Sequence, residues 1–545
     1  MDPALKPAQA AQAQGSLAQG DAEDGFRSLV DAVREHARAR PDKLAFRFEG
    51  RGTTFAQFDR HTDQVANALI AAGVQPGDRV AHVGKNTDVY FEALVGAMKA
   101  RAVMTPVNWR LVGPEIVYIA QDSRPKVIFV GSEFIDQARE IVPQLDPRPL
   151  MVAIEGGAPE WPSFDAWRNA APAGPPDRSP EMTDVAIQLY TSGTTGRPKG
   201  AMLTHLSLVG LRQLPGREQP AWNTWSEDDI GLIAMPIFHI GGTGWGVTTL
   251  FNGATGVIAR EFDPNAVLDF IERDRVSKIF LVPAAMQIVV RHPRAREVDY
   301  SRLQNILYGA SPIPLDLLKE CMEVFGCGFV QMYGMTETAG AIVALPPEDH
   351  TPDGSPKMRS AGKALPGVEV AIVDEAGNRL PPGQVGEIAA RSVANMAGYF
   401  NLPEATAKTI DAQGWLRTGD AGYMDAEGYV YIHDRVKDMI ISGGENIYPA
   451  EVENAIFGHP KVEEVAVIGV PSERWGEEVK AVVVPRAGET IEPAEIIAWA
   501  RERIAAYKAP KSVDVIDALP RNPSGKILRR ELRAPYWEGR ERGVN

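Results

Sequence analysis

The sequence has little of three things that would each define a class of protein. It has two cysteines, Cys321 and Cys327, with no histidine cluster beside them, so neither a disulfide framework nor a zinc site is indicated. It has no uninterrupted apolar run of about 18 residues, which argues against a membrane-spanning helix. Basic residues are outnumbered, 57 against 71, for a net charge of −14, which argues against a nucleic-acid partner. We therefore expect a cytoplasmic enzyme that binds any anionic ligand locally.

The chain is too long for one hydrophobic core and is expected to form two or more domains. Residues 1–24 are rich in Ala, Gln and Gly and lack a basic start, so we interpret them as a disordered extension. Over residues 25–434, apolar residues at helical spacing alternate with short apolar runs that lead into polar loops. These runs are Arg79–Val83, Lys126–Val130, Val185–Leu189, Lys278–Val282 and Asn305–Tyr308. They are typical of buried parallel strands and predict an α/β fold.

The composition changes after about Asp434 to a small α+β pattern that covers residues 439–545, and we place the domain boundary at 435–438. The expected helices are Pro449–Phe457 and Pro493–Ala506, and the expected strands are Glu464–Val470 and Val479–Pro485. In open α/β sheets, ligands collect at the carboxyl ends of strands. Because the notable motifs follow such strands, the site is expected to be assembled from distant loops.

The first motif is the stretch Tyr190–Gly200, which combines glycines, hydroxyl side chains and a lysine. Glycines let the backbone approach an anion, hydroxyls donate hydrogen bonds, and a lysine adds a compact positive charge. It is not a Walker A loop, since Pro198 and Gly200 flank Lys199 and disfavour the helix start that this motif needs. A surface turn is the alternative, but the composition favours a clasp for polyphosphate.

The second motif, Gln331–Thr338, holds an aromatic ring, a glycine, hydroxyl groups and a carboxylate. Tyr333 is suited to stack on a base, and Thr336 to donate to a phosphate. Glu337 is suited to hold Mg²⁺, which takes oxygen ligands and is usually shared between carboxylate and phosphate. The alternative is a strand that runs into a capped helix.

Three further segments place polar groups toward the C-terminus. Asp420 follows a turn, and with both carboxylate oxygens free it would accept the two hydroxyls of a ribose. The segment Ser442–Pro449 contains a Gly-Gly pair, for which a hairpin turn is the alternative interpretation. Lys526 follows a Gly turn near the C-terminus and would by itself be taken for a solvated lysine.

In this order, the motifs resemble those of the adenylate-forming superfamily, which contains acyl-CoA synthetases, nonribosomal adenylation domains and firefly-type luciferases. The resemblance runs from about Gly25 to Arg530 and is strongest to acyl-CoA synthetases. It implies a large N-terminal AMP-binding domain of α/β subdomains and a small mobile α+β C-terminal domain. It also implies ATP, Mg²⁺ and coenzyme A, with a carboxylic acid activated as acyl-adenylate and then transferred to the CoA thiol.

The resemblance also gives each motif a role. Catalysis is implied for Lys526, Thr336, Glu337 and His239, with Glu337 as the metal ligand. ATP or AMP binding is implied for Thr191, Ser192, Gly193, Thr194, Thr195, Lys199, Gly309, Ala310, Ser311, Tyr333, Gly334, Thr336, Asp420, Ile432 and Arg435. CoA binding is implied for Ser442, Gly443 and Gly444, and the hinge for Lys437 within 435–438. The acyl pocket is implied for His239, Gly242, Trp245 and Gly334.

The substrate is predicted from the segment Met235–Gly246, in which four glycines make room along one wall and Trp245 offers an apolar surface. No Lys, Arg or Asp stands in this segment, so an uncharged apolar tail is favoured. A medium- or long-chain fatty acid is the first choice and an aryl or arylpropenoic acid the second. The expected partners are therefore small molecules, namely the acid, ATP and CoA, and a homodimer is left open.

Three other functions compete with this one. A luciferase-like oxygenase would share the adenylation motifs, and so would a stand-alone adenylation enzyme. A non-catalytic nucleotide-binding protein would have lost charged residues from the motifs, but Lys526, Glu337, Asp420 and Arg435 are all present. We therefore expect an acid–thiol ligase.

Overall fold

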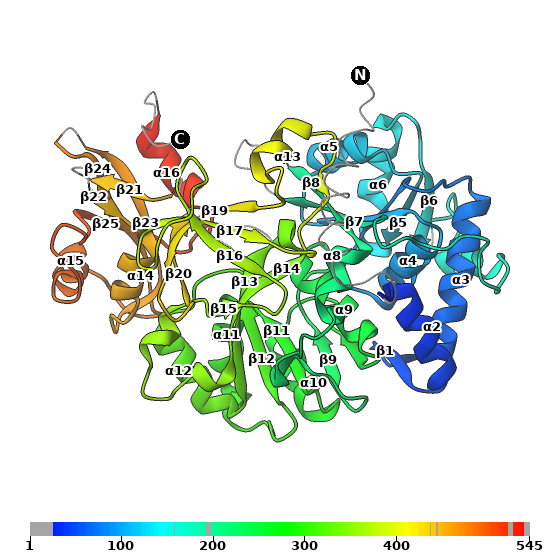
Figure 1. The fold of residues 1–545 in the computed structure, drawn as a ribbon, viewed down its shortest axis with the longest axis horizontal. Helices are drawn as coiled ribbons and strands as arrows, with labels where there is room; N and C mark the ends of the chain where they lie inside the picture. The colour runs from blue at the N-terminus through cyan, green and yellow to red at the C-terminus, as the bar shows by residue number, and fades with distance from the viewer. Residues whose placement is uncertain are drawn as a thin grey trace.

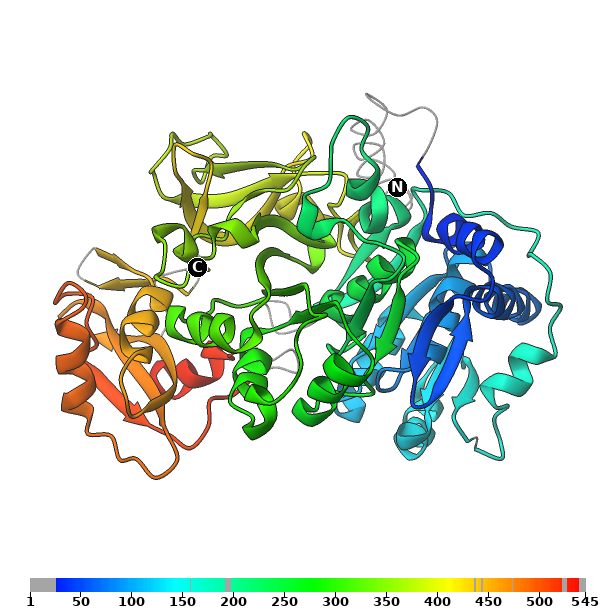
Figure 2. The same cartoon turned by 90° about the horizontal axis from the view of Figure 1, so that it is seen from below.

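The computed structural model describes residues 26–156, 158–191, 198–435, 438–442, 445–472, 474–521 and 527–538, without the side chains of 434, 435, 445 and 446. The proposed extension at 1–24 lies outside them. Among the described helices, none is both long and apolar enough to cross a membrane. Figure 1 shows a large body that ends in a smaller C-terminal part, at the left, and Figure 2 shows the same division from below.

Two large mixed sheets form most of the body (Figure 1). The first has the order β15 (Lys363–Ala364), β14 (Gly340–Leu345), β13 (Gly328–Met335), β12 (Asn305–Gly309), β11 (Lys278–Leu281), β9 (Ile230–Ile233), β10 (Thr255–Ile258), β1 (Leu44–Phe48), β2 (Arg51–Thr54). The second has the order β18 (Gly398–Tyr399), β8 (Lys199–Thr204), β7 (Val185–Thr191), β4 (Val103–Val107), β3 (Arg79–Val83), β5 (Val127–Gly131), β6 (Leu150–Ile154). In the first sheet the strands from β13 to β1 are parallel and the outer strands β2, β14 and β15 are antiparallel. In the second sheet the strands from β7 to β6 are parallel, and β8 and β18 are antiparallel.

Six of the twelve helices that the structure describes in the body begin at a polar side-chain cap, namely α2, α3, α4, α7, α8 and α10. Thr54 caps α3 together with Gln57, and the helix buries Val65 and Leu69, as expected for apolar residues at helical spacing. The helices of the body are α2 (Leu29–Ala39), α3 (Phe55–Ala71), α4 (Asp88–Lys99), α5 (Gly113–Ser123), α6 (Ile135–Ile141), α7 (Phe164–Asn169), α8 (His205–Val209), α9 (Ile240–Phe251), α10 (Pro264–Arg273), α11 (Pro283–Val290), α12 (Leu315–Phe325) and α13 (Pro403–Thr409). Cys321 on α12 is buried, and both cysteines are free.

Two smaller sheets complete the described structure. One is fully antiparallel, with the order β16 (Glu369–Val373), β17 (Gly386–Arg391), β19 (Leu416–Met424), β20 (Val430–Arg435). The other consists of β22 (Glu445–Ile447), β21 (Ile440–Ser442), β24 (Gly476–Pro485), β23 (Val462–Ser472) and β25 (Ser512–Val515), with helices α14 (Pro449–Phe457), α15 (Pro493–Arg501) and α16 (Arg529–Trp537). The α/β fold with a small α+β C-terminal part is therefore confirmed.

The small part packs against the body through Glu463 on β23. Its Oε1 accepts hydrogen bonds from Gln287 Nε2 at 2.7 Å and from Arg291 Nη1 at 2.6 Å. Helix α14 has the predicted bounds, but α15 ends at Arg501 instead of Ala506, because the chain turns there to return as β25. The boundary at 435–438 stays a prediction, and residues 436 and 437 lie outside the described part.

One buried histidine links this fold to pH. His82 on β3 is 1% exposed, and neither ring nitrogen has a hydrogen-bond partner among the described residues. Burial lowers its pKa from 6.5 to about 3. Below pH 6.5 His82 is protonated in the unfolded chain but stays neutral in the folded chain. The stability that neutral His82 contributes is therefore complete above pH 6.5 and is lost as the pH falls toward 3.

We therefore expect the variant His82→Leu to lose less stability than the wild type between pH 7 and pH 5. For one such histidine the difference is about 2 kcal/mol over this interval, and urea midpoints at the two pH values measure it. His292→Asn, at a half-buried histidine, is the matched control. Equal acid destabilisation of His82→Leu and the wild type would contradict the assignment.

Candidate active site

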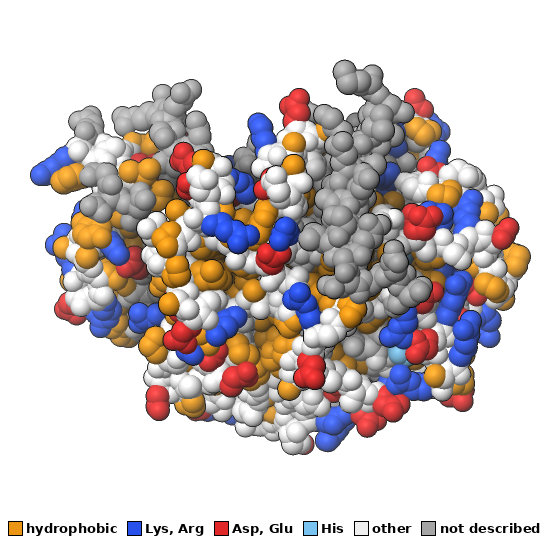
Figure 3. All heavy atoms as spheres, viewed as in Figure 1, with side chains coloured by type: hydrophobic (Ala, Val, Ile, Leu, Met, Phe, Trp, Pro, Cys, Tyr) orange, Lys and Arg blue, Asp and Glu red, His pale blue; other side chains and the backbone are white. Residues whose placement is uncertain are grey.

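A cavity of about 2180 Å³ lies where the sheets meet, and it is lined by most of the predicted site residues that the structure describes. These are Thr191, Lys199, His239, Trp245, Ala310, Ser311, Tyr333, Gly334, Thr336, Glu337, Asp420 and Ile432. Figure 3 shows hydrophobic side chains gathered across the middle of one face of the molecule, with charged groups around them. Residues more than 200 positions apart in the sequence thus share one cavity.

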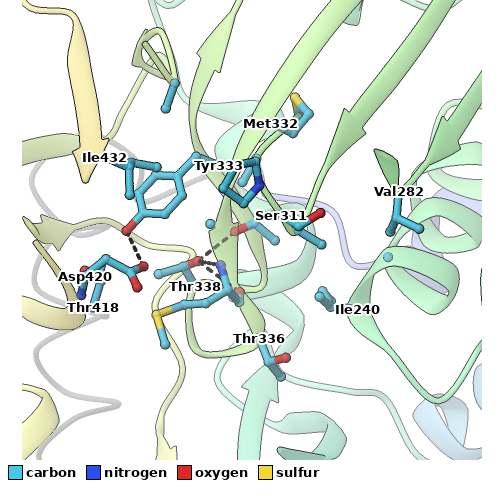
Figure 4. Close-up of a pocket in the computed structure, with 18 of the residues that line it drawn as sticks. Ile240, Val282, Ser311, Met332, Tyr333, Thr336, Thr338, Thr418, Asp420 and Ile432 are labelled. Atoms are coloured by element: carbon cyan, nitrogen blue, oxygen red, sulfur yellow. Dashed lines mark hydrogen bonds between the residues drawn. The ribbon is translucent and has the colours of Figure 1, made fainter. Parts of the chain in front are cut away.

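Tyr333 and Asp420 are directly hydrogen-bonded across this cavity. The Tyr333 hydroxyl, on β13, donates to Asp420 Oδ2 on β19 at 2.8 Å, and Figure 4 shows Ile432 beside the tyrosine ring. The expectation that both oxygens of Asp420 are free is therefore wrong, since the phenol occupies one. A carboxylate has about four acceptor positions, so Asp420 retains capacity for further donors.

Glu337 is a buried carboxylate with hydroxyl partners. It lies in a single turn (Thr336–Thr338) that follows β13 and is 5% exposed. Its Oε1 accepts from Tyr399 Oη at 2.7 Å and from Thr191 Oγ1 at 3.5 Å. In the described part of the chain it has no ion pair. A buried carboxylate without a cation is costly, so this position suits a bound metal ion.

The described residues contain no cluster of three or more metal-ligating side chains. A Mg²⁺ site does not need one, because Mg²⁺ usually keeps several waters and is shared between one or two carboxylates and phosphate oxygens. The donor set around Glu337 therefore fits Mg²⁺ that is brought with a polyphosphate. The ion would neutralise phosphate charge there.

The Tyr190–Gly200 segment begins in β7 and ends in β8, which pair with each other in antiparallel fashion. Thr191 at its start and Lys199 at its end are register partners, and the Lys199 ammonium lies 5.0 Å from the centre of the Tyr399 ring. The predicted residues between them, Ser192, Gly193, Thr194 and Thr195, lie outside the described part. The two ends of the segment thus stand beside Glu337.

Two predicted glycines allow neighbouring strands to approach closely. A Cβ on Gly309 would lie 2.1 Å from the Met332 carbonyl oxygen, and one on Gly334 would lie 1.9 Å from that of Gly340. Gly309 is not among the residues that line the cavity, but Ala310 and Ser311 directly after it are. Because these glycines have no side chain, β12, β13 and β14 can pack closely, and this packing places Tyr333 and Thr336 at the cavity.

Helix α9 forms one wall of the cavity and begins directly after His239. The residues that face the cavity include Gly241, Gly244 and Trp245. His239 Nε2 and Trp245 Nε1 are buried and have no hydrogen-bond partner in the described structure. Burial, with a smaller contribution from Arg110, lowers the pKa of His239 to about 4, so the imidazole is neutral at pH 7.

Gly242, which the motif also assigns to the acyl pocket, is not among the residues that line the cavity. A Cβ at this position would lie 2.2 Å from the Pro236 carbonyl oxygen. The helical period places residues 241, 244 and 245 on the cavity side and turns Gly242 toward the preceding chain. Only part of the glycine-rich segment therefore makes room for a substrate.

The small C-terminal part supplies the remaining wall. Ile527, Leu528 and Arg529 line the cavity, and they directly follow Lys526, which lies outside the described residues. Ser442 ends β21 and is not among the residues that line the cavity. Gly443, Gly444, Lys437 and the side chain of Arg435 also lie outside the described part, although the Arg435 backbone pairs with Asp420.

Comparison with known proteins decides the family. The model of the AMP-binding enzyme family matches residues 33–400, and that of the AMP-binding enzyme C-terminal domain matches residues 451–526. The chain belongs to the AMP-binding enzyme family. This makes it an adenylate-forming acid–thiol ligase, as the motifs predicted.

Three relatives illustrate the range of this AMP-binding family. The fatty acid–[acyl-carrier-protein] ligase ScoC of Streptomyces coeruleorubidus is 42% identical over 95% of this chain and 98% of its own. A feruloyl-CoA synthase from an Amycolatopsis species is 42% identical over 92% and 97%. The solved structure of the anthranilate CoA ligase AuaEII with anthranoyl-AMP has a TM-score of 0.85 at 27% identity, over 94% and 97%.

The cavity of this AMP-binding enzyme also includes residues from segments that carry no motif. Tyr399, which donates to Glu337, is the last residue of a strand of two residues, which is too short to show a pattern. Arg212 and Asn223 lie in short turns between α8 and β9 and line the cavity beyond Trp245. Isolated polar residues in irregular segments give no periodic or motif signal.

Proposed function

We propose that this AMP-binding enzyme is an ATP-dependent acyl-CoA synthetase. The observation that carries the proposal is that one cavity holds two groups of residues. The first group is the Tyr333–Asp420 pair, Glu337, Thr191 and Lys199, and the second is the apolar wall formed by α9. The first group suits a nucleotide with its metal, and the wall suits the body of a carboxylic acid. The two reactants would therefore meet near Thr336 and Gly334.

In the first step, a carboxylate oxygen of the acid attacks the α-phosphorus of ATP, and the bond from that phosphorus to the bridging oxygen of the pyrophosphate breaks. Lys526 would offset the repulsion between carboxylate and α-phosphate, and Thr336 would donate to the α-phosphate. The segment from Thr191 to Lys199 would hold the departing pyrophosphate. Catalysis of this kind rests on positioning and preorganised charge.

Nucleotide recognition is proposed for the adjoining groups. Tyr333 and the segment Gly309–Ser311 would frame the adenine, with Ile432 beside the tyrosine ring. Asp420 and Arg435 would bind the ribose. Tyr333 would also position Asp420, because the hydrogen bond at 2.8 Å fixes one oxygen of its carboxylate.

In the second step, the sulfur of CoA attacks the carbonyl carbon of the adenylate, AMP leaves and the thiol loses its proton. We propose that rotation about Lys437 withdraws Lys526 and brings Ser442, Gly443 and Gly444 to the cavity. The glycines would leave room for the pantetheine arm, since they carry no side chain. CoA is therefore the proposed acceptor.

The acid is proposed to have an apolar body that lies along α9, with a medium- or long-chain fatty acid as the first candidate. An aryl or arylpropenoic acid is the second, and it is favoured by the 42% identity to the feruloyl-CoA synthase and by the paired rings of Trp225 and Trp245, 5.2 Å apart. Aromatic side chains offer offset contacts that suit a planar substrate.

The test is AMP formation with octanoate, palmitate, benzoate, cinnamate and ferulate, each with ATP and Mg²⁺ and with or without CoA. We expect AMP and an acyl-CoA with at least one acid, and pyrophosphate release without CoA. An oxygenase would instead consume oxygen with the adenylate. No AMP with any of the acids would refute the proposed ligase.

A further inference from the structure

The acyl wall of the cavity ends in polar groups. Helix α9 presents Gly241, Gly244, Trp245 and Thr248 to the cavity. At a rise of 1.5 Å per residue, Thr248 lies about 13 Å along the helix axis from His239. At this distal end the lining includes Arg212, Gln219 and Asn223 as well as Thr248. An entirely aliphatic tail would meet hydrogen-bonding groups there.

Arg212 is the charged residue of this distal end. It is half-buried, and its Nη1 donates to Asn223 Oδ1 at 3.1 Å and its Nη2 to Thr248 Oγ1 at 3.1 Å. Both partners are neutral. A guanidinium carries five N–H donors in a rigid fork, and the remaining ones have no protein acceptor in the described structure. They are available to a molecule in the cavity.

No neighbouring side chain in the described structure neutralises the positive charge of Arg212. In the described part of the chain no carboxylate forms an ion pair with it, and desolvation alone lowers its pKa, to about 10. The nearby Lys278 is itself buried and pairs with Asp229 at 3.3 Å. That carboxylate also accepts from Ser277 and from the Ser226 backbone. Arg212 therefore keeps its positive charge at pH 7 without a counter-ion.

We infer that Arg212 determines specificity, and that it selects an acid bearing an oxygen acceptor at the end remote from the reacting carboxyl group. This inference rests on the proposed ligase and narrows its substrate class, because among the fatty and aryl acids proposed above it favours those with a distal oxygen over the unsubstituted ones. A second carboxylate would neutralise the guanidinium and accept two parallel hydrogen bonds, and a phenol or ether oxygen would accept one. A plain alkyl or phenyl end would displace water from Arg212 and return no hydrogen bond, which is costly for a charged group.

The test compares matched acids that differ in the distal oxygen. Octanedioate is compared with octanoate, and 3-(4-hydroxyphenyl)propenoate with 3-phenylpropenoate, through kcat/KM of pyrophosphate release by the full chain. The wild type is expected to prefer the oxygen-bearing member of at least one pair by about 10- to 100-fold, the range for a hydrogen bond to a charged group. The pair that shows the preference distinguishes a carboxylate from a phenol.

In Arg212→Met the ratio is expected to fall to about 1, mainly through KM, because the interaction forms in the ground state as well as in the transition state. Arg212→Lys should keep a charge without the fork and give an intermediate ratio. Arg217→Met, at an exposed arginine of the same segment, should leave the ratio unchanged.

Two results would overturn the inference. One is a wild-type enzyme with the same kcat/KM for each plain acid and its oxygen-bearing counterpart. This result does not depend on whether a variant folds. The other is an Arg212→Met enzyme that loses activity equally toward both members of the preferred pair, as a structural role would require. In both cases AMP still forms, whereas failure of the proposed ligase would leave all the acids unused.

Discussion

Glu337→Gln is expected to lower kcat/KM for pyrophosphate release by about 10²–10³, the usual loss when one electrostatic contact to the transition state is removed. Glutamine has nearly the same shape and can still accept from the hydroxyls of Tyr399 and Thr191, which lie 2.7 and 3.5 Å from Oε1. The fold should therefore survive, and the charge that holds Mg²⁺ is removed. Initial rates measured over a Mg²⁺ titration should show the dependence displaced to higher concentration.

The matched control is Tyr399→Phe, which removes one hydrogen bond to Glu337 and keeps its charge. A neutral hydrogen bond contributes about 0.5–1.5 kcal/mol, so this variant should lose roughly tenfold or less and keep the Mg²⁺ dependence of the wild type. If Glu337→Gln had the wild-type rate and Mg²⁺ dependence, another group would have to hold the metal.

Lys526→Ala is expected to lower the rate of adenylate formation by about 10²–10³ or more. It should leave thioester formation from supplied acyl-adenylate largely intact. The physical reason is that the lysine would cancel repulsion between two anions that meet only in the first step. Pyrophosphate exchange measures the first step, and acyl-CoA formed from synthetic adenylate measures the second.

Lys511→Ala is the control for Lys526→Ala, because Lys511 is an exposed lysine of the same small domain. It should leave both half-reactions unchanged. An equal loss of both steps in Lys526→Ala would argue against the division of labour between them, and would point to a lysine needed for the structure of the small domain.

The sequence predicted the parts of this fold that local patterns determine. The apolar runs before the motifs are strands, and Arg79–Val83 has the predicted bounds and is buried from Val80 to Val83, as expected for a central parallel strand. The motifs lie after strands of two different sheets, and the rule that ligands collect at strand ends brought Thr191 and Glu337 to one site.

Features that depend on distant partners were not predictable in this way. The antiparallel sheet of β16, β17, β19 and β20 was not predicted either, although its strands are neighbours along the chain. The bond from Tyr333 to Asp420 spans two sheets, and Arg212 bonds to Asn223 in a later turn and to Thr248 on α9. The orientation of Gly242 depends on where the helix begins, and helix ends are the least certain part of a pattern.

The cavity has one further thermodynamic consequence. Its walls come from both large sheets, the antiparallel sheet and the C-terminal part, so a nucleotide binds with full affinity only when all of them are folded and assembled. Binding at 100 times the dissociation constant stabilises the native state by about 2.7 kcal/mol. This free energy is lost when any one of the walls unfolds. Bound ATP would therefore make the separate cores unfold together, in a more cooperative transition.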